Sequence, residues 1–158
     1  MCVRSTAVPE PVPLENLSVL TDQLIVLSDA RQTDRITVTG HNTLEIFLDL
    51  CRRGFLNATC RTCAEGPHTS DNSTDSLWIV EAEDAAELRT LVAKCGRDLR
   101  PHGTLLVSMK SHSGGDAALL LGAVLLKCGF QPLRRLSSTR HVLLLCRRQA
   151  NAGVQIAA

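Results

Sequence analysis

The stretch LWIVEAEDAAELRTLVAKCGRDLRPHGTLLVSM, from Leu77 to Met109, decides the fold of this chain. It opens with the apolar run Leu77–Val80, which is too short for a buried helix and predicts a strand. Pro101 and Gly103 end a predicted amphipathic helix, and Thr104–Met109 predicts a second strand. Apolar residues mark one face of that helix at three- and four-residue steps: Leu88, Leu91, Val92, Cys95 and Leu99. A strand, a crossover helix and a strand predict a parallel pair, which needs cover on both faces of the sheet.

Acidic residues stand where this predicted helix begins. Glu81, Glu83 and Asp84 place negative charge near the exposed N–H groups of the first turn. We predict that Asp84 caps the helix. Glu81 comes directly off the strand, so it is the better candidate for a functional carboxylate that orients an amine or acts as a base.

A second strand–helix unit precedes this stretch. Ile36–Thr39 is β-branched throughout and stops at Gly40, which is typical of a buried strand. Asn42 or Thr43 can cap a helix that runs to about Arg53. The predicted apolar side of that helix consists of Leu44, Phe47, Leu48 and Cys51.

The remaining pattern completes an alternation of strands and helices. It predicts a helix over 14–27, a strand over 55–63, a loop over 65–76, a Gly-rich turn at 111–116, a helix over 117–128 and a closing hairpin over 133–148. This order predicts an α/β three-layer sandwich with mainly parallel strands and an antiparallel strand in the C-terminal hairpin. Residues 1–13 are expected to form a Pro-rich arm, 14–148 a single domain and 149–158 a tail.

Composition narrows the classes of partner. The 158-residue chain has a net charge of +1, three Phe, one Trp and no Tyr, which does not favour nucleic-acid binding. Five arginines of the last quarter fit a solvated strand face: Arg134, Arg135, Arg140, Arg147 and Arg148. No apolar run is long enough to span a bilayer, so no membrane partner is predicted. Seven Cys and the absence of an apolar leader predict a reduced, cytoplasmic protein.

Cys60 and Cys63 have the spacing of half a zinc site, and His68 follows them. A structural zinc usually needs four ligands, often from two such pairs, and the sequence has no second pair. A redox pair of this spacing usually opens a helix, whereas this one accompanies a predicted strand. We therefore predict no metal site and two thiols on a half-buried strand.

Three segments together resemble the class I methyltransferases that use S-adenosylmethionine. RITVTGHNTLEIFLDLCRRGF (35–55) looks like that family's first strand, glycine loop and first helix. TDSLWIV…TLLVSM (74–109) looks like its fourth strand, next helix and fifth strand, including an L-x-P-x-G-x-L-L-V passage. KCGFQPLRRLSSTRHVLLLCRR (127–148) looks like its closing hairpin. The resemblance covers about 30–148 and implies a Rossmann-like sheet whose last strand is antiparallel.

The resemblance also implies a cofactor site. The family's loop after the first strand is rich in glycine, and here it reads Gly40-His41-Asn42. An acid after the second strand holds the ribose in the family, and Glu65 is the only acid near that position here. Glu65 matches equally well the family's acidic site beside the adenine. The residues implied for S-adenosylmethionine are therefore Gly40, His41, Asn42, Glu65 and Glu81, with Lys110 at the same edge of the predicted sheet.

Two functions follow. The first is a methyltransferase, or a remnant of one that binds S-adenosylmethionine or a related nucleoside in the cleft at the carboxyl ends of the strands. The second is a non-catalytic interaction module, as a homodimer for example, which uses apolar surface exposed by a missing unit. Between Thr39 and Asp75 there is room for one helix, one strand and a loop, one helix and strand fewer than in the family. That shortening and the single glycine favour the second function, and Gly40–Asn42 then forms a simple strand–helix turn.

Overall fold

The computed structural model describes residues 14–61, 73–110, 116–137 and 141–150. Their elements are α1 (Leu14–Ser28), β1 (Ile36–Gly40), α2 (Thr43–Arg52), β2 (Ala58–Cys60), β3 (Thr74–Ala82), α3 (Ala85–Cys95), η1 (Gly96–Asp98), β4 (Leu99–Lys110), α4 (Asp116–Lys127), β5 (Phe130–Ser137) and β6 (His141–Arg148). Within these ranges the strands form one six-stranded sheet in the order β2-β1-β3-β4-β6-β5.

The centre of the sheet is parallel, as the sequence predicts. β1, β3 and β4 lie side by side, with Val38 opposite Trp78 and Trp78 opposite Leu106. β2 extends the parallel set at one edge, while β6 runs antiparallel to both β4 and β5. The predicted α/β sandwich with an antiparallel C-terminal strand is confirmed.

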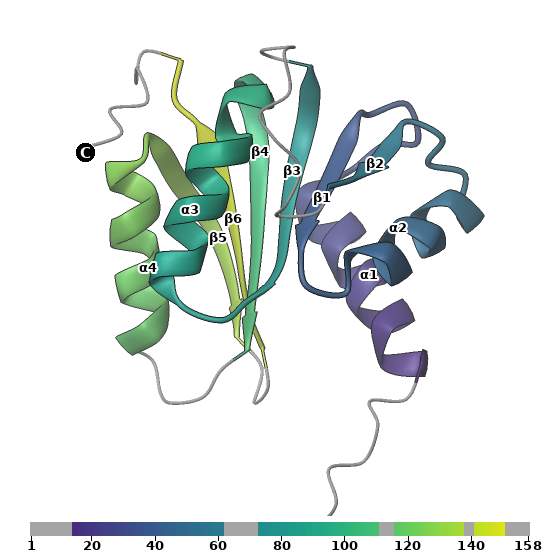
Figure 1. Cartoon of the computed structure of the whole chain (residues 1–158), viewed down its shortest axis with the longest axis horizontal. Coiled ribbons are helices and arrows are strands. Elements are labelled where there is room, and N and C mark those ends of the chain that lie inside the picture. Colours follow the sequence, from purple (N-terminus) through teal and green to yellow (C-terminus); the bar gives the residue numbers. More distant parts are fainter. Residues whose placement is uncertain (1–13, 62–72, 111–115, 138–140, 151–158) are drawn as a thin grey trace, which may run out of the picture.

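Helices cover both faces of this sheet. Figure 1 shows α3 and α4 in front of the sheet and α1 and α2 on its other side. Leu77 and Ile79 of β3 pack with α3 and α4, whereas Trp78 and Val80 pack with α1 and α2. A strand buried on both sides reads as a continuous apolar run, which explains the run at the end of β3.

α2 buries a different face from the predicted one. Its buried residues are Thr43, Ile46 and Leu50, whereas Leu44 and Leu48 are exposed. Apolar residues occupy both sides of this helix in sequence, so periodicity alone selects the wrong stripe. Contact with α1 and the sheet decides which side is buried.

Three predicted boundaries are also wrong. α3 ends at Cys95, and Leu99 begins β4 by pairing with Thr74 instead of closing the helix. β3 begins at Thr74, inside the predicted loop, and β2 spans only Ala58–Cys60 of the predicted 55–63 strand. β4 begins early because Leu99 pairs with Thr74 of β3. Pairing between distant segments cannot be predicted from a local sequence pattern.

None of the helices in the described ranges is both long and apolar enough to cross a membrane. The cysteines of these ranges are free thiols, with Cys95 and Cys146 buried. Burial raises the pKa of the Cys146 thiol to about 12, and burial likewise raises the pKa of Cys128. The predicted arm at 1–13 and tail residues 151–158 lie outside the described residues.

Candidate functional site at the carboxyl edge of the sheet

Polar side chains from several elements meet where the parallel strands end. The carboxyl ends of β1, β3 and β4 share one edge of the sheet, the lower edge in Figure 1. This is the edge at which open α/β sheets bind ligands. The structure brings together there the predicted residues Gly40, His41, Asn42, Glu81 and Lys110, and adds Glu87 and His141.

Glu81 is the centre of this group. Its side chain is only 10% exposed, and its Oε2 accepts a hydrogen bond of 2.6 Å from Asn42 Nδ2. Lys110 Nζ lies 3.8 Å from one carboxylate oxygen and His141 Nε2 lies 3.8 Å from the other. One largely buried carboxylate therefore faces an amide and two basic groups that come from three different elements.

The backbone around this contact has an unusual conformation. Asn42 and Glu81 both have φ of 53°, in the left-handed region. Asn adopts this region readily, but for Glu it is uncommon. A non-glycine residue held there costs on the order of 1–3 kcal/mol, and such residues cluster at functional sites. The end of β3 thus carries local strain at its most buried acid.

Gly40 is required by the contact between two strands. Its φ is 108°, and a Cβ added to it would overlap the carbonyl oxygen of Val80. The next residue extends the same contact, because the backbone N–H of His41 donates to that oxygen over 2.9 Å. The glycine after β1 therefore permits close approach of β1 and β3.

The other side of the loop is joined to α3. His41 Nε2 lies 2.8 Å from Glu87 Oε1, and Glu87 Oε2 accepts a 2.7 Å bond from Glu83 N. Asp84 accepts a 2.7 Å bond from Glu87 N, so it caps α3 as predicted. These bonds form a capping arrangement to which His41 is added.

The same arrangement offers ligand atoms that the sequence did not point to. One atom each from His41, Glu83 and Glu87 lie within 4.8 Å of one another, close enough to share a divalent cation. All three have protein contacts that account for their positions: the capping bonds and an ion-pair distance of 3.9 Å between His41 and Glu83. Because Glu83 is exposed, this is an accessible surface cluster.

Several predicted residues lie outside the described ranges, namely Glu65, Cys63 and His68. Among the described ones, Cys60 is a half-buried free thiol at the end of β2. His141 and Glu87 are the site residues that sequence reasoning missed. His141 reaches the site only through the antiparallel pairing of β6 with β4, where it is opposite Lys110. No local motif marks it.

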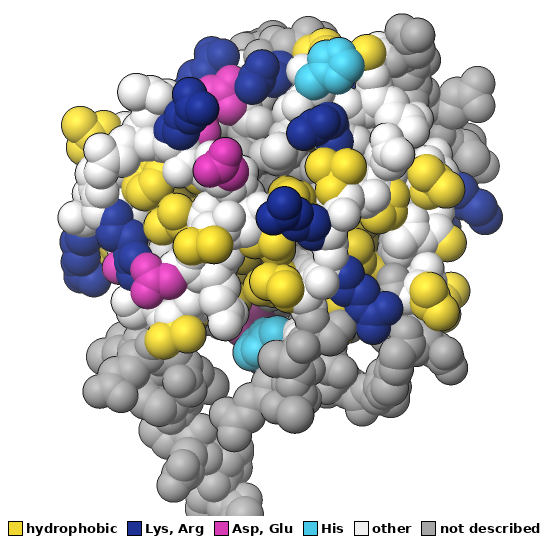
Figure 2. All heavy atoms as spheres, turned by 180° about the vertical axis from the view of Figure 1, so that it is seen from behind, with side chains coloured by type: hydrophobic (Ala, Val, Ile, Leu, Met, Phe, Trp, Pro, Cys, Tyr) yellow, Lys and Arg dark blue, Asp and Glu magenta, His cyan; other side chains and the backbone are white. Residues whose placement is uncertain are grey.

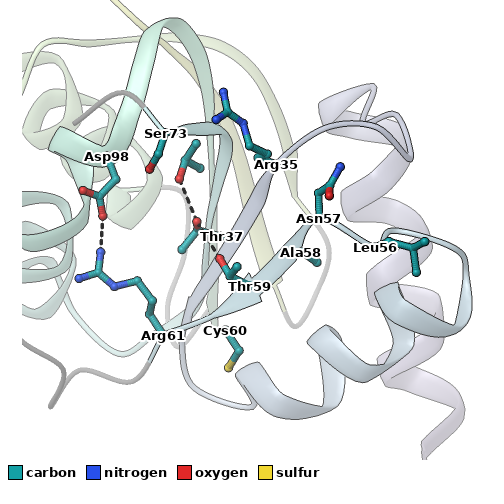
Figure 3. Close-up of a pocket in the computed structure, with 11 residues that line it drawn as sticks. Arg35, Thr37, Leu56, Asn57, Ala58, Thr59, Cys60, Arg61, Ser73 and Asp98 are labelled. Atoms are coloured by element: carbon teal, nitrogen blue, oxygen red, sulfur yellow. Dashed lines mark hydrogen bonds and ion pairs between the residues drawn. The ribbon is translucent and has the colours of Figure 1, made fainter. Parts of the chain in front are cut away.

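A second hollow lies along β1 and β2, shown in Figure 3. It has a volume of about 830 Å³, and its floor is a chain of threonine hydroxyls. Thr37 Oγ1 lies 3.2 Å from Thr59 Oγ1 and 3.0 Å from Thr74 Oγ1. On one side of it the buried ion pair of Arg61 with Asp98 joins the residue after β2 to η1.

This hollow lies at the shortened end of the sheet. β2 is the last strand on that side within the described residues, and residues 62–72 of the stretch in which a strand and helix are predicted to be missing lie outside them. The predicted exposed apolar surface is present in part: Leu56, which lines this hollow, is 83% exposed, whereas the floor is polar. Its hydroxyls are hydrogen-bonded to one another and its charges are paired.

Comparison with known proteins finds solved structures with a similar fold. No family model and no curated protein sequence matches the chain. The chain is similar to the solved [4+2]-cyclase SpnF, with 15% identity, a TM-score of 0.68 and coverage of 85% of this chain and 82% of that one. It is similar to an S-adenosylmethionine-dependent methyltransferase from Aquifex aeolicus, with 10% identity, a TM-score of 0.61 and coverage of 87% and 99%. It is also similar to geranyl diphosphate methyltransferase in complex with S-adenosylmethionine, with 10% identity, a TM-score of 0.62 and coverage of 90% of this chain and 93% of that one.

These likenesses define the class of fold. The chain has a Rossmann-like α/β fold of the kind seen in solved S-adenosylmethionine-dependent methyltransferases. One of the similar structures is named for a cyclisation, so the fold by itself does not specify methyl transfer.

Proposed function

We propose that this domain binds S-adenosylmethionine or a related nucleoside at the carboxyl edge of its sheet, around Glu81. The observation that carries the proposal is the largely buried carboxylate of Glu81, surrounded by Asn42, Lys110 and His141. The backbone of Glu81 is in the left-handed region. Gly40, His41 and Asn42 border the same place, and Glu65 is proposed as a further contact. Solved structures of similar fold hold S-adenosylmethionine or S-adenosylhomocysteine, which supports this class of ligand.

The side chains fit the polar groups of such a ligand. A carboxylate complements ribose hydroxyls or an α-ammonium group, and an adjacent Lys and His complement an α-carboxylate. The methyl group on the cofactor's sulfonium is already reactive when bound. A catalytic version of the site would therefore mainly have to position cofactor and acceptor. Glu81 is the residue best placed to bind and orient the cofactor.

Thermal melting with S-adenosylmethionine and with S-adenosylhomocysteine tests the proposal. Ligand at about a hundred times its Kd stabilises a fold by about 2.7 kcal/mol, which raises the Tm of a chain of this size by roughly 5 to 10 °C. Glu81→Gln keeps the size of the side chain and should abolish most of the rise, whereas the exposed Glu45→Gln should keep it. An unchanged Tm for the wild type at millimolar concentration of both ligands refutes the proposal.

A non-catalytic interaction module is the second candidate. The specific observation in its favour is that protein contacts alone account for the loop after β1: Gly40 meets Val80, His41 meets Glu87 and Asn42 meets Glu81. A protein partner or a second copy would then be the functional ligand. An unchanged Tm with both nucleosides, together with concentration-dependent association, would favour this candidate.

A reducing compartment such as the cytoplasm is part of the proposal. Support comes from the odd number of cysteines and from the burial of free thiols such as Cys146 in the core. Cysteine labelling of the protein in intact cells would test it, since every thiol should be recovered reduced.

A further inference from the structure

The outer face of α4 is exposed to solvent, yet it consists of apolar residues where charged or polar residues are expected. Leu119, Leu120 and Leu126 are 69%, 63% and 55% exposed, and Ala123 lies among them and is also exposed. Helical spacing places these four residues on one side, opposite Leu121 and Leu125, which are buried in the core. A helix that is apolar on all sides is normally covered on all sides.

The position of α4 leaves this face open. α4 lies at the outer edge of the helix layer, beyond α3 (Figure 1), and it packs against α3, β5 and β6. The opposite face of the molecule is different in character. Figure 2 shows hydrophobic side chains there interspersed with Lys and Arg. Between Leu119 and Leu126, in contrast, α4 has no charged or polar residue.

The order of residues along α4 is nearly symmetrical about its centre. When the residue order of α4 is reversed about its midpoint, between Gly122 and Ala123, Leu119 takes the place of Leu126. The small residues Gly122 and Ala123 exchange places in the same way. Small residues at a crossing point allow two helices to approach closely while the flanking leucines interlock. A two-fold axis at this point places Leu119 of each copy against Leu126 of the other, as in an isologous dimer, and leaves Leu120 at the margin because its counterpart Leu125 is buried.

Charge agrees with an antiparallel arrangement. The helix begins at Asp116 and ends at Lys127, the only ionisable residues in its sequence. Antiparallel pairing brings the acidic end of one helix to the basic end of the other and opposes the two helix dipoles. Parallel pairing would place like ends together.

We propose that the outer face of α4, formed by Leu119, Leu120, Ala123 and Leu126, is a homodimer interface in which two copies pack α4 against α4 in antiparallel orientation. A stable complex usually buries about 800 Å² on each partner, and one twelve-residue helix offers less. The dimer is therefore weak, with dissociation in the micromolar range.

Sedimentation of the whole chain from micromolar to near-millimolar concentration tests the interface. The wild type should shift from monomer to dimer as concentration rises. Leu119→Glu should remain monomeric, because it places a charge opposite Leu126 of the second copy. Leu44→Glu is the matched control, since Leu44 is 57% exposed on α2, and it should dimerise as the wild type does. A monomeric wild type throughout, or equal dimerisation of L119E and L44E, overturns the proposal.

A mixing experiment tests the antiparallel register. L119E and L126K should each be monomeric alone, yet a mixture should form a heterodimer, because Glu and Lys then face each other on one side and Leu119 and Leu126 on the other. The control mixture is L119E with L119K, which antiparallel packing does not bring together. Association in the control mixture but not in the first overturns the antiparallel arrangement. Circular dichroism of each variant verifies that it is folded.

Discussion

The two ends of the sheet differ in what fills the space beside them. At the β4-β6-β5 end, α3 and α4 cover the strands, and Leu105, Val107 and Phe130 are buried against them. At the β1-β2 end the corresponding face carries hydrogen-bonded threonines and the Arg61–Asp98 pair. On this face of the sheet the first end is an apolar core, whereas the second end carries paired polar groups.

This difference separates stability from function. Apolar cores on both faces of the sheet hold the fold together, while the candidate ligand site lies where β1 and β3 end and draws most of its side chains from loops and strand termini.

Removal of an aromatic side chain at the apolar end should have the largest effect. Phe130 is fully buried against Gly96 and the α3–α4 layer. Phe130→Ala should lower the free energy of unfolding by about 4 kcal/mol. Urea denaturation measures it, with the half-exposed Leu133→Ala as the control that should change little. Equal effects of the two substitutions would contradict the assignment of the core.

The buried ion pair at the polar end should come next. Asp98→Asn leaves the Arg61 guanidinium without its carboxylate and should cost about 3 kcal/mol. The exposed pair of Arg53 with Asp22 provides the matched control, since Asp22→Asn should cost at most about 1 kcal/mol. If the two asparagine variants have the same free energy of unfolding in urea, the Arg61–Asp98 pair does not stabilise the fold more than an exposed ion pair does.

Gly40→Ala tests whether the glycine after β1 is structural. Because a Cβ there overlaps Val80 and the backbone φ is 108°, the substitution should destabilise the ligand-free protein by about 2 kcal/mol. Gly96→Ala is the control, because its φ is −64° and the added Cβ would lie 3.6 Å from Phe130 Cζ, an ordinary contact. A G40A protein as stable as the wild type without ligand would mean that the glycine is not needed for strand contact.

The Cys146 thiol predicts a pH dependence. Burial raises its pKa from 9.0 to about 12, so between these values the folded state keeps a proton that the unfolded state loses. Its contribution to stability is complete below pH 9 and is lost as the pH rises toward 12, by up to about 1.4 kcal/mol per pH unit. The stability difference between the wild type and Cys146→Ala should therefore shrink on going from about pH 8 to about pH 10. A difference that stays constant over this range would show that the thiol ionises normally.

The sequence is sufficient for the parts of the fold that repeat a local pattern. The parallel set of β1, β3 and β4 follows from apolar runs that end at Gly40, Glu81 and Lys110, and the cap at Asp84 follows from its position before the helix. It failed where tertiary contact decides, as in α2, which has apolar residues on two sides. It failed also at β5, which begins at Phe130 and accommodates Pro132 because an edge strand tolerates a missing donor.

The candidate site was only partly predictable for the same reason. Gly40, Asn42 and Glu81 follow strands, so their common edge is implied once the strands are parallel. Glu87 lies in the local cap of α3, but its contact with His41 joins distant parts of the chain, and His141 joins the site only through the antiparallel pairing of β6 with β4. The left-handed backbone of Glu81 has no signature in the sequence at all.

Calorimetric titration of S-adenosylhomocysteine into the wild type, Glu81→Gln and Glu45→Gln tests most directly whether Glu81 is the centre of a nucleoside site. We expect saturable binding at one site per chain for the wild type and E45Q, and at least a roughly tenfold weaker Kd for E81Q, equivalent to about 1.4 kcal/mol. Absence of binding to the wild type at millimolar ligand, or the same Kd for all three proteins, would contradict it.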